Sequence, residues 1–365
     1  MSKKILSGVL LTLATCGLLP FNSAYANGCY WVNGNAGPIN YVANMDAQYI
    51  PRDAKIGDPI GLIERPFLLS GGGLSVHCIT DGARLTFNAM ATAPPAPGPA
   101  PRLNGAPASG TVLATNIDGV GALIKLGSPY DGATTGFWKL NSVDSTVPFD
   151  GFIDFSTPFV LQHSVLRGTV TLIKTGRIGR GKHLLASSNE LFKASFTDVP
   201  NAFSLALSGS VTQAECTLST NPVSADPVKL GEWPDTDFKG EGHTTLAVPF
   251  SIALNSCISD PLPGGFVANA HIRLDPVAGS TTLDASKGLF SLGSGATAKG
   301  VGIQILGGVD AMTPVELESD AIQGVIPASG GMLLKFNARY YQTGPTTDVS
   351  AGSADASLAF TITYK

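Results

Sequence analysis

The sequence of 365 residues has little charge, little cysteine and almost none of the patterning that marks helices. Only 14% of its residues are charged, and 23 lysines and arginines stand against 27 aspartates and glutamates. A nucleic-acid partner is not expected, because such partners require a basic surface. Almost no window places apolar residues at the spacing of an amphipathic helix, so helices are not expected to build the fold.

Catalytic and metal-binding patterns are also missing. Neither the cysteines nor the five scattered histidines show the CxxC or HxxxH spacing of a zinc site. No Gly-x-Ser-x-Gly nucleophile elbow occurs. Asp150, Asp154 and Glu190 are carboxylates of the kind that glycosidases pair, but nothing in the sequence brings them together. We therefore expect no enzyme, no metal and no cofactor.

Residues 1–26 predict a secretory signal. Lys3 and Lys4 precede an apolar run over residues 5–21, and the small residues of Ala24-Tyr25-Ala26 suit signal cleavage. The mature chain is then expected to start at Asn27, with its net charge moved from −4 to −6 by the loss of the two lysines. A lipoprotein signal ending at Cys16 is the alternative, although the preceding residue suits that motif poorly.

The remaining residues predict an all-β protein of two domains. The 43 glycines and 25 prolines suit short strands joined by tight turns, and residues 27–365 are enough for two domains. The N-terminal half, residues 27–208, has the strand spacing of a sandwich or barrel. The clearest predicted strands there are 60–63, 85–87, 121–126 and 166–173.

Four cysteines remain after processing, and an even number in an exported protein predicts disulfides. Three pairings are possible. We predict Cys29–Cys78 and Cys216–Cys257, because each pair then lies within one block of similar composition. Loops of this size stabilise a fold by about 4 kcal/mol in the chain-entropy account.

The last eight residues predict a β-strand with one buried face. Leu358, Phe360, Ile362 and Tyr364 alternate with small or polar residues. The sequence gives no further turn or strand after them. We therefore expect a strand edge whose backbone groups must be paired by something else.

Residues 209–365 resemble the pilin domain of chaperone–usher pilus subunits. In that family an immunoglobulin-like sandwich lacks its last strand and borrows one from a partner. The resemblance implies a periplasmic chaperone, an outer-membrane usher and an adjacent pilus subunit as partners, and it assigns the terminal apolar residues to chaperone and donor-strand contact. The matching pieces are Val211–Cys216, Val228–Gly231, Pro249–Cys257, Gly300–Ile305, Leu333–Tyr340 and the terminal strand.

The segment ahead of this domain is unusual for a pilin. In ordinary pilins the segment before the first sandwich cysteine is a free donor strand at the mature N-terminus. Here Phe203, Leu205 and Leu207 lie in mid-chain. We expect them to complete the N-terminal domain, with a boundary between residues 208 and 209, as in a subunit at the end of a fibre.

The N-terminal half resembles the receptor-binding domain of fimbrial tip adhesins of the type 1 group. The similar features are Thr115–Gly121, Leu172–Gly176 and Cys29 at mature position three. The resemblance implies a pocket beside the predicted Cys29–Cys78 bridge. The candidates are Asn27, Tyr30, Trp31, Thr80 and Asp81.

Each candidate also has a structural interpretation, since the aromatic residues suit a core or edge and Asp81-Gly82 suits a turn. Asn27 and Thr80 depart from the mannose-binding pattern, so mannose is not the expected receptor. A second candidate surface is a basic stretch that suits an acidic glycan or a matrix protein, or else forms a solvated hairpin connection. Its residues are Lys174, Arg177, Arg180 and Lys182.

Together these features predict a two-domain adhesin exported through the periplasm to the tip of a fimbrium, where it binds a host glycan or matrix protein. A structural minor pilin and a secreted hydrolase are the alternatives. The former needs a usable N-terminal donor strand, and the latter needs a catalytic constellation.

Overall fold

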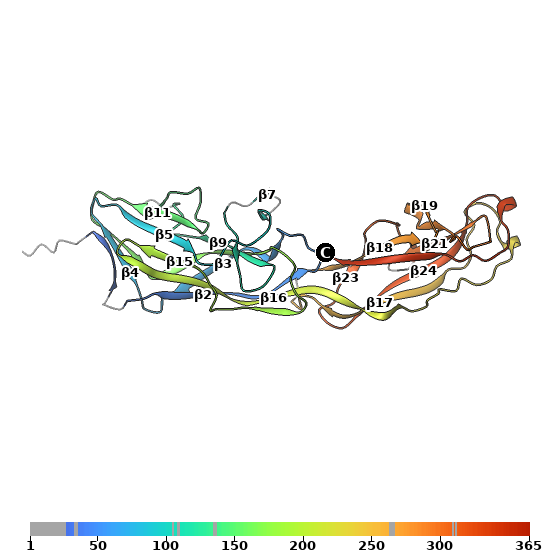
Figure 1. The fold of residues 1–365 in the computed structure, drawn as a ribbon, viewed down its shortest axis with the longest axis horizontal. Helices are drawn as coiled ribbons and strands as arrows, with labels where there is room; N and C mark the ends of the chain where they lie inside the picture. The colour runs from blue at the N-terminus through green and yellow to red at the C-terminus, as the bar shows by residue number, and fades with distance from the viewer. Residues whose placement is uncertain are drawn as a thin grey trace, which may run out of the picture.

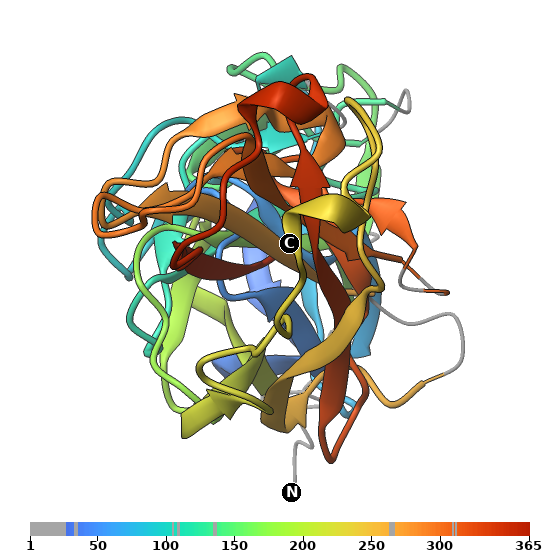
Figure 2. The ribbon, with the colours of Figure 1, turned by 90° about the vertical axis from the view of Figure 1, so that its right-hand side faces the viewer.

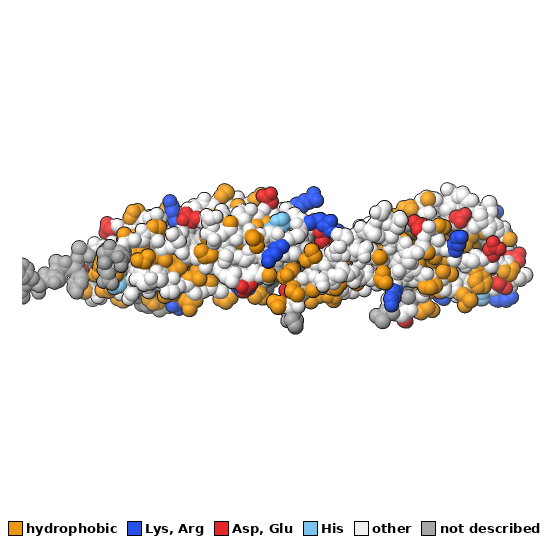
Figure 3. All heavy atoms as spheres, turned by 90° about the horizontal axis from the view of Figure 1, so that it is seen from below, with side chains coloured by type: hydrophobic (Ala, Val, Ile, Leu, Met, Phe, Trp, Pro, Cys, Tyr) orange, Lys and Arg blue, Asp and Glu red, His pale blue; other side chains and the backbone are white. Residues whose placement is uncertain are grey.

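The computed structural model describes residues 27–32, 36–103, 106–107, 110–133, 137–262, 267–308, 310 and 312–365. The predicted signal over residues 1–26, with the alternative at Cys16, lies outside them. The chain is all-β and forms two domains end to end, with a narrowing between them (Figures 1 and 3). Seen along the length of the molecule, the C-terminal domain lies in front of the N-terminal one (Figure 2). In the described part of the chain, no helix combines the length and the apolar character needed to cross a membrane.

The N-terminal domain packs two main sheets around one core. One sheet has the order β10-β11-β5-β15-β16, with β2 and β14 also paired to β16, and the other has the order β3-β13-β9-β8. The four strands predicted there lie in β3, β5, β9 and β13, and the prediction is confirmed. The strands are β1 (Gly28–Trp31), β2 (Ile39–Pro51), β3 (Pro59–Ser70), β4 (Val76–Thr80), β5 (Leu85–Ala91), β6 (Arg102–Leu103), β7 (Ala106–Pro107), β8 (Leu113–Ala114), β9 (Val120–Leu126), β10 (Lys139–Leu140), β11 (Phe149–Ile153), β12 (Phe159–His163), β13 (Val165–Lys174), β14 (Lys182–Leu185), β15 (Glu190–Phe196) and β16 (Val199–Val223).

The C-terminal domain is a second sandwich. One sheet has the order β16-β17-β24-β21-β20-β19, and the facing sheet has the order β23-β18-β25. Its strands are β17 (Val248–Ile258), β18 (Asn269–Val277), β19 (Thr282–Asp284), β20 (Leu289–Ser291), β21 (Val301–Gly307), β22 (Thr313–Pro314), β23 (Ala321–Val325), β24 (Met332–Gln342) and β25 (Ser357–Tyr364). Three short 3-10 helices, η2 (Asp235–Asp237), η3 (Ala285–Lys287) and η4 (Thr346–Asp348), lie in its connections.

Strand β16 belongs to both domains. Its first part pairs with β15, β14 and, in parallel, β2, and its last part pairs with β17. Phe203, Leu205 and Leu207 are buried in the N-terminal core. That core ends at Val211 and the C-terminal core begins at Ala214, so the predicted division between residues 208 and 209 falls inside this strand.

Gly209 explains the break in the apolar alternation of β16. It lies at a bulge opposite β2, with φ of 116°. A Cβ there would lie 2.5 Å from the carbonyl oxygen of Asp46. Only glycine accommodates both the backbone angle and this close approach, so the bulge lets β16 continue along β2.

Both predicted disulfides are present. Cys29–Cys78 joins the paired strands β1 and β4, and Cys216–Cys257 joins β16 and β17. Each bridge therefore ties the first strand of its domain to a neighbour. Because the four cysteines of the described chain are bonded in pairs, they do not serve as zinc ligands.

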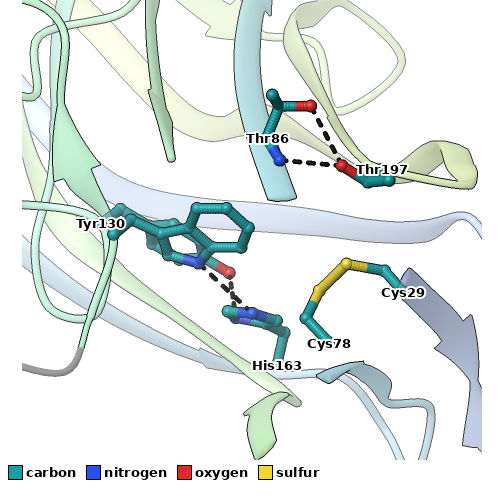
Figure 4. Close-up of a disulfide and its surroundings, with 7 residues drawn as sticks. Cys29, Cys78, Thr86, Tyr130, His163 and Thr197 are labelled. Carbon is teal, nitrogen blue, oxygen red and sulfur yellow. Dashed lines mark hydrogen bonds between the residues drawn. A yellow bond between two sulfur atoms is a disulfide. The ribbon is translucent and has the colours of Figure 1, made fainter. Parts of the chain in front are cut away.

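The core beside the Cys29–Cys78 bridge contains a buried histidine (Figure 4). The indole N–H of Trp138 donates to Nε2 of His163 at 3.3 Å, and the Tyr130 hydroxyl lies 3.1 Å from Nδ1. Since an indole only donates, Nδ1 carries the proton of the neutral ring and donates to the tyrosine oxygen. Burial, aided by His77, lowers the pKa of His163 from 6.5 to about 3.

Acid should therefore destabilise the N-terminal domain. In the unfolded chain His163 becomes protonated below pH 6.5, whereas in the folded domain it stays neutral down to about pH 3. The contribution of neutral His163 to the free energy of unfolding is therefore fully present above pH 6.5 and is lost as the pH falls toward 3. We expect a loss of about 3 kcal/mol by about pH 4.5 from this residue. Calorimetry of His163→Phe should show lower stability at neutral pH and a flatter acid dependence, with half-buried His183→Gln as the control. An unchanged acid dependence in His163→Phe would assign the effect to carboxylates.

Truncation within β16 tests its role in the N-terminal domain. A fragment of residues 27–208 keeps Phe203, Leu205 and Leu207 of β16, whereas one of residues 27–200 loses them and exposes the edges of β15 and β2. Thermal melts should show the longer fragment folded and the shorter one unfolded or aggregated. Equal stability would show that this part of β16 is dispensable.

Candidate functional site

An apolar groove of about 740 Å³ opens along one side of the C-terminal domain. One rim is formed by Val223, at the end of β16, and residues 225–232 after it. The other rim is formed by residues 354–358 and Phe360, which include the start of β25. Leu358 and Phe360 on this second rim are only half-buried, whereas Ile362 and Tyr364 further along β25 are buried. The floor consists of Phe250, Ile252, Leu274, Phe290, Ile303, Ile305, Phe336, Ala338 and Tyr340. Most of these floor residues belong to the buried core of the sandwich, and Phe250 and Tyr340 are half-buried.

Strand β25 borders the groove and has one strand partner. It pairs antiparallel with β18, where Asn269 and Lys365 exchange both backbone hydrogen bonds just past the strand end. Because bonding alternates along an antiparallel ladder, residues 357, 359, 361 and 363 face β18 and residues 358, 360, 362 and 364 face the other edge. Pro276, which has no N–H, lies opposite Leu358 at a position where none is needed. No strand of the described chain pairs with that other edge.

The predicted receptor pocket lies at the far end of the N-terminal domain, where β1 pairs with β4 (Figure 1). The side-chain oxygen of Asn27 accepts from the backbone N–H of Asp81 at 2.5 Å, and both residues are exposed. Tyr30 is 45% exposed and contacts His77 edge-on, whereas Trp31 packs partly against the core. Thr80 is fully buried, and its hydroxyl donates to the carbonyl of Ala83.

The same end of the domain carries other residues that the sequence analysis did not predict as part of a binding site. The backbone N–H of Gly82 donates to the carbonyl of Phe155, which joins the turn after β4 to the loop after β11. The guanidinium of Arg84 lies 3.5 Å from the centre of the Phe152 ring. Lys139, paired with Asp154 at 2.6 Å, approaches the same ring. These groups come from three strands and their loops, so no local pattern joins them.

The basic stretch lies at the junction between the domains, not at the far end. Lys174 is buried and donates to the carbonyl of Arg52 at 2.7 Å, and burial lowers the pKa of its ammonium against the pull of Asp53 and Asp58. Arg180 pairs at 2.6 Å with the nearly buried carboxylate of Glu215. Lysine and arginine side chains gather near the middle of the molecule (Figure 3).

Arg177, Arg180 and Lys182 are exposed, although Arg180 also pairs with Glu215. Lys174 is therefore the buried member of the stretch, and the other three residues face solvent. Among the described residues, no three His, Cys, Asp or Glu side chains come together as metal ligands.

Comparison with known proteins gives consistent similarities. A family model described as "Fimbrial protein" matches residues 205–365. The uncharacterised fimbrial-like protein SfmA of Escherichia coli K12 is 34% identical over 173 residues, covering 47% of this chain and 89% of SfmA. Fimbrial subunit type 1 of Salmonella typhimurium is 35% identical over 159 residues, covering 43% of this chain and 80% of that subunit. Among solved structures, the CupB6 tip adhesin from Pseudomonas aeruginosa is similar at 16% identity and a TM-score of 0.35, over 92% of this chain and 94% of that one.

Proposed function

The chain belongs to the fimbrial protein family, and we propose that it is the two-domain adhesin at the tip of a chaperone–usher fimbrium. Fimbrial proteins are structural or adhesive rather than enzymatic, which agrees with the missing catalytic motifs. In this proposal the N-terminal domain binds a receptor and the C-terminal domain anchors the protein to the fibre.

The observation that carries the tip position is the burial of β16 ahead of the pilin domain. A fibre subunit donates the segment before its own sandwich to a neighbour. Here residues 203–211 of that segment are paired with β2 on one side and with β15 or β14 on the other. Releasing these residues would expose the N-terminal core. In this proposal the subunit therefore accepts a strand from a neighbour but does not donate residues 203–211 to one. That favours a terminal adhesin over a structural minor pilin.

The groove along β25 is the proposed attachment site. An added strand would pair with the free edge of β25 and place alternate apolar side chains over Leu358 and Phe360. A periplasmic chaperone would supply this strand first, and the adjacent pilus subunit would replace it after passage through the usher. The protein would thereby leave the periplasm for the cell surface.

The receptor is proposed to bind at the far end of the N-terminal domain. Asn27 and Asp81 supply exposed amide and carboxylate groups, and Tyr30 and Phe152 supply aromatic surface. This combination suits a glycan, whose hydroxyls need hydrogen-bond partners and whose ring faces pack on aromatic side chains. A matrix-protein receptor bound through Arg177 and Lys182 is the alternative.

Charged substitutions in the groove should prevent strand capture. Leu358→Asp with Phe360→Asp places carboxylates against the apolar floor, and burying them without partners is costly. Co-purification with the chaperone from the periplasm should be lost. Thr361→Asp is the matched control, because Thr361 lies on the exposed face of β25 and its change leaves the groove intact. Unimpaired capture by the double variant would exclude the groove as the attachment site.

Asp81→Asn should weaken receptor binding by tenfold or more and leave thermal stability unchanged. The expected loss follows from an unpaired receptor hydroxyl, which costs about 1–3 kcal/mol. The turn itself should persist, because its bond to Asn27 uses the backbone N–H of Asp81. Glycan and matrix-protein arrays probed with residues 27–208 provide the measurement, and Asp118→Asn, another exposed turn aspartate, is the control.

The alternative receptor has its own test on the same arrays. If Arg177→Ala with Lys182→Ala abolished binding, and binding by the unaltered domain faded as salt rose, the receptor would be acidic and would bind near the junction. Full adhesion by Asp81→Asn would remove the pocket beside the Cys29–Cys78 bridge from consideration.

A further inference from the structure

The N-terminal domain closes one end of the free edge of β25. Arg52 and Asp53, in the loop after β2, hydrogen-bond to backbone groups on that edge. Arg52 Nη2 donates to the carbonyl of Ile362 at 2.8 Å. The N–H of Asp53 donates to the carbonyl of Tyr364 at 3.1 Å, and the N–H of Tyr364 donates to Asp53 Oδ2 at 2.8 Å. We call these two residues the edge clamp.

The edge clamp is held from several sides. Arg52 and Asp53 pair with each other at 2.8 Å, and the guanidinium lies 4.7 Å from the centre of the Tyr364 ring. The backbone N–H of Arg52 donates to the carbonyl of Ala214 on β16, and its carbonyl accepts from buried Lys174. Charge pairing and these backbone hydrogen bonds hold the edge clamp in a fixed position at the junction between the domains.

The clamp divides the free edge of β25 into two parts. At Ile362 and Tyr364 it already bonds three of the four backbone groups that face this edge, and the side chains of both residues are buried. At Leu358 and Phe360 the ladder with β18 leaves the N–H and C=O groups directed toward the groove. The groove lining ends at Phe360, where the clamp begins.

We propose that the Arg52–Asp53 clamp fixes the length and register of the strand that docks in the groove, by occupying the end of the β25 edge where that strand would otherwise continue. This rests on the proposed function, in which the occupant is an extended segment of another subunit with alternating apolar residues. Such a segment lies beside residues 354–360, pairs with β25 where that strand begins at Ser357, and stops at the clamp. Its docked part is then about seven residues long, one for each residue that it faces.

Synthetic peptides of alternating valine and threonine test the proposal on the mature chain. A peptide of about 11 residues should dissociate no more slowly than one of about 7, because the clamp blocks the extra residues. In Arg52→Ala with Asp53→Ala the longer peptide should dissociate about tenfold more slowly, since it gains the hydrogen bonds of Ile362 and Tyr364. Lys139→Ala with Asp154→Ala removes an ion pair at the far end of the N-terminal domain and should behave like the unaltered chain.

Equal dissociation of both peptides from the clamp variant would overturn the proposal. Failure of every peptide to bind the unaltered chain would instead reject strand docking itself, and with it the proposed function. Amide exchange on the unaltered chain gives a second readout that needs no variant. The Tyr364 amide should be protected before and after peptide binding, and the Phe360 amide only after it. A Tyr364 amide that becomes protected only with peptide would show that the strand displaces the clamp.

Discussion

Both domains depend on the pairing of β16, a single strand of 25 residues. Its first part is a central strand of the N-terminal sheet, and its last part carries Cys216 at the start of the C-terminal sandwich. A strand paired on both sides cannot leave without breaking two ladders and exposing apolar side chains. The junction is therefore continuous backbone within sheets rather than a loose linker.

The C-terminal domain leaves its own sheet unfinished. Backbone groups on the free edge of β25 need partners, and the described part of the chain supplies them only at Ile362 and Tyr364, through the neighbouring domain. Nearer the start of β25, Leu358 and Phe360 are half-buried beside the apolar groove. An edge of this kind invites strand addition, which is a hazard in most proteins and the basis of assembly in this proposal. The junction thus joins the N-terminal and C-terminal domains through hydrogen bonds as well as through β16.

Charged side chains at the junction between the domains stabilise the fold by pairing within the molecule. Glu215 is almost buried, and a buried carboxylate without a partner is costly, so Arg180 and Arg52 beside it offset that cost. Lys174 is likewise committed to a backbone carbonyl. Of the basic stretch that the sequence suggested as a receptor surface, Arg177 and Lys182 are exposed, and Arg180 is exposed but paired with Glu215. Exposed polar and aromatic groups gather instead at the far end, next to Asn27 and Asp81.

The sequence by itself determined the fold class, both disulfides and the alternating strand that ends the chain. These depend on local signals, namely turn residues, period-two patterns and the position of each cysteine within its block. The sequence also predicted that Phe203, Leu205 and Leu207 belong to the N-terminal core, because their alternation follows a half of the chain whose sequence already predicts strands.

Only the tertiary structure decided which polar groups meet. Arg52 and Ile362 are more than 300 residues apart, as are Asp53 and Tyr364, and no pattern in either segment shows that the domains join there. The burial of Thr80 and Lys174 could not be predicted either, because the local sequence around a hydroxyl or ammonium group does not show whether that group is buried. Strand order and domain packing bring such residues together across the chain. Local sequence therefore predicted the strands, while long-range pairing fixed the junction, the groove and the surfaces left for partners.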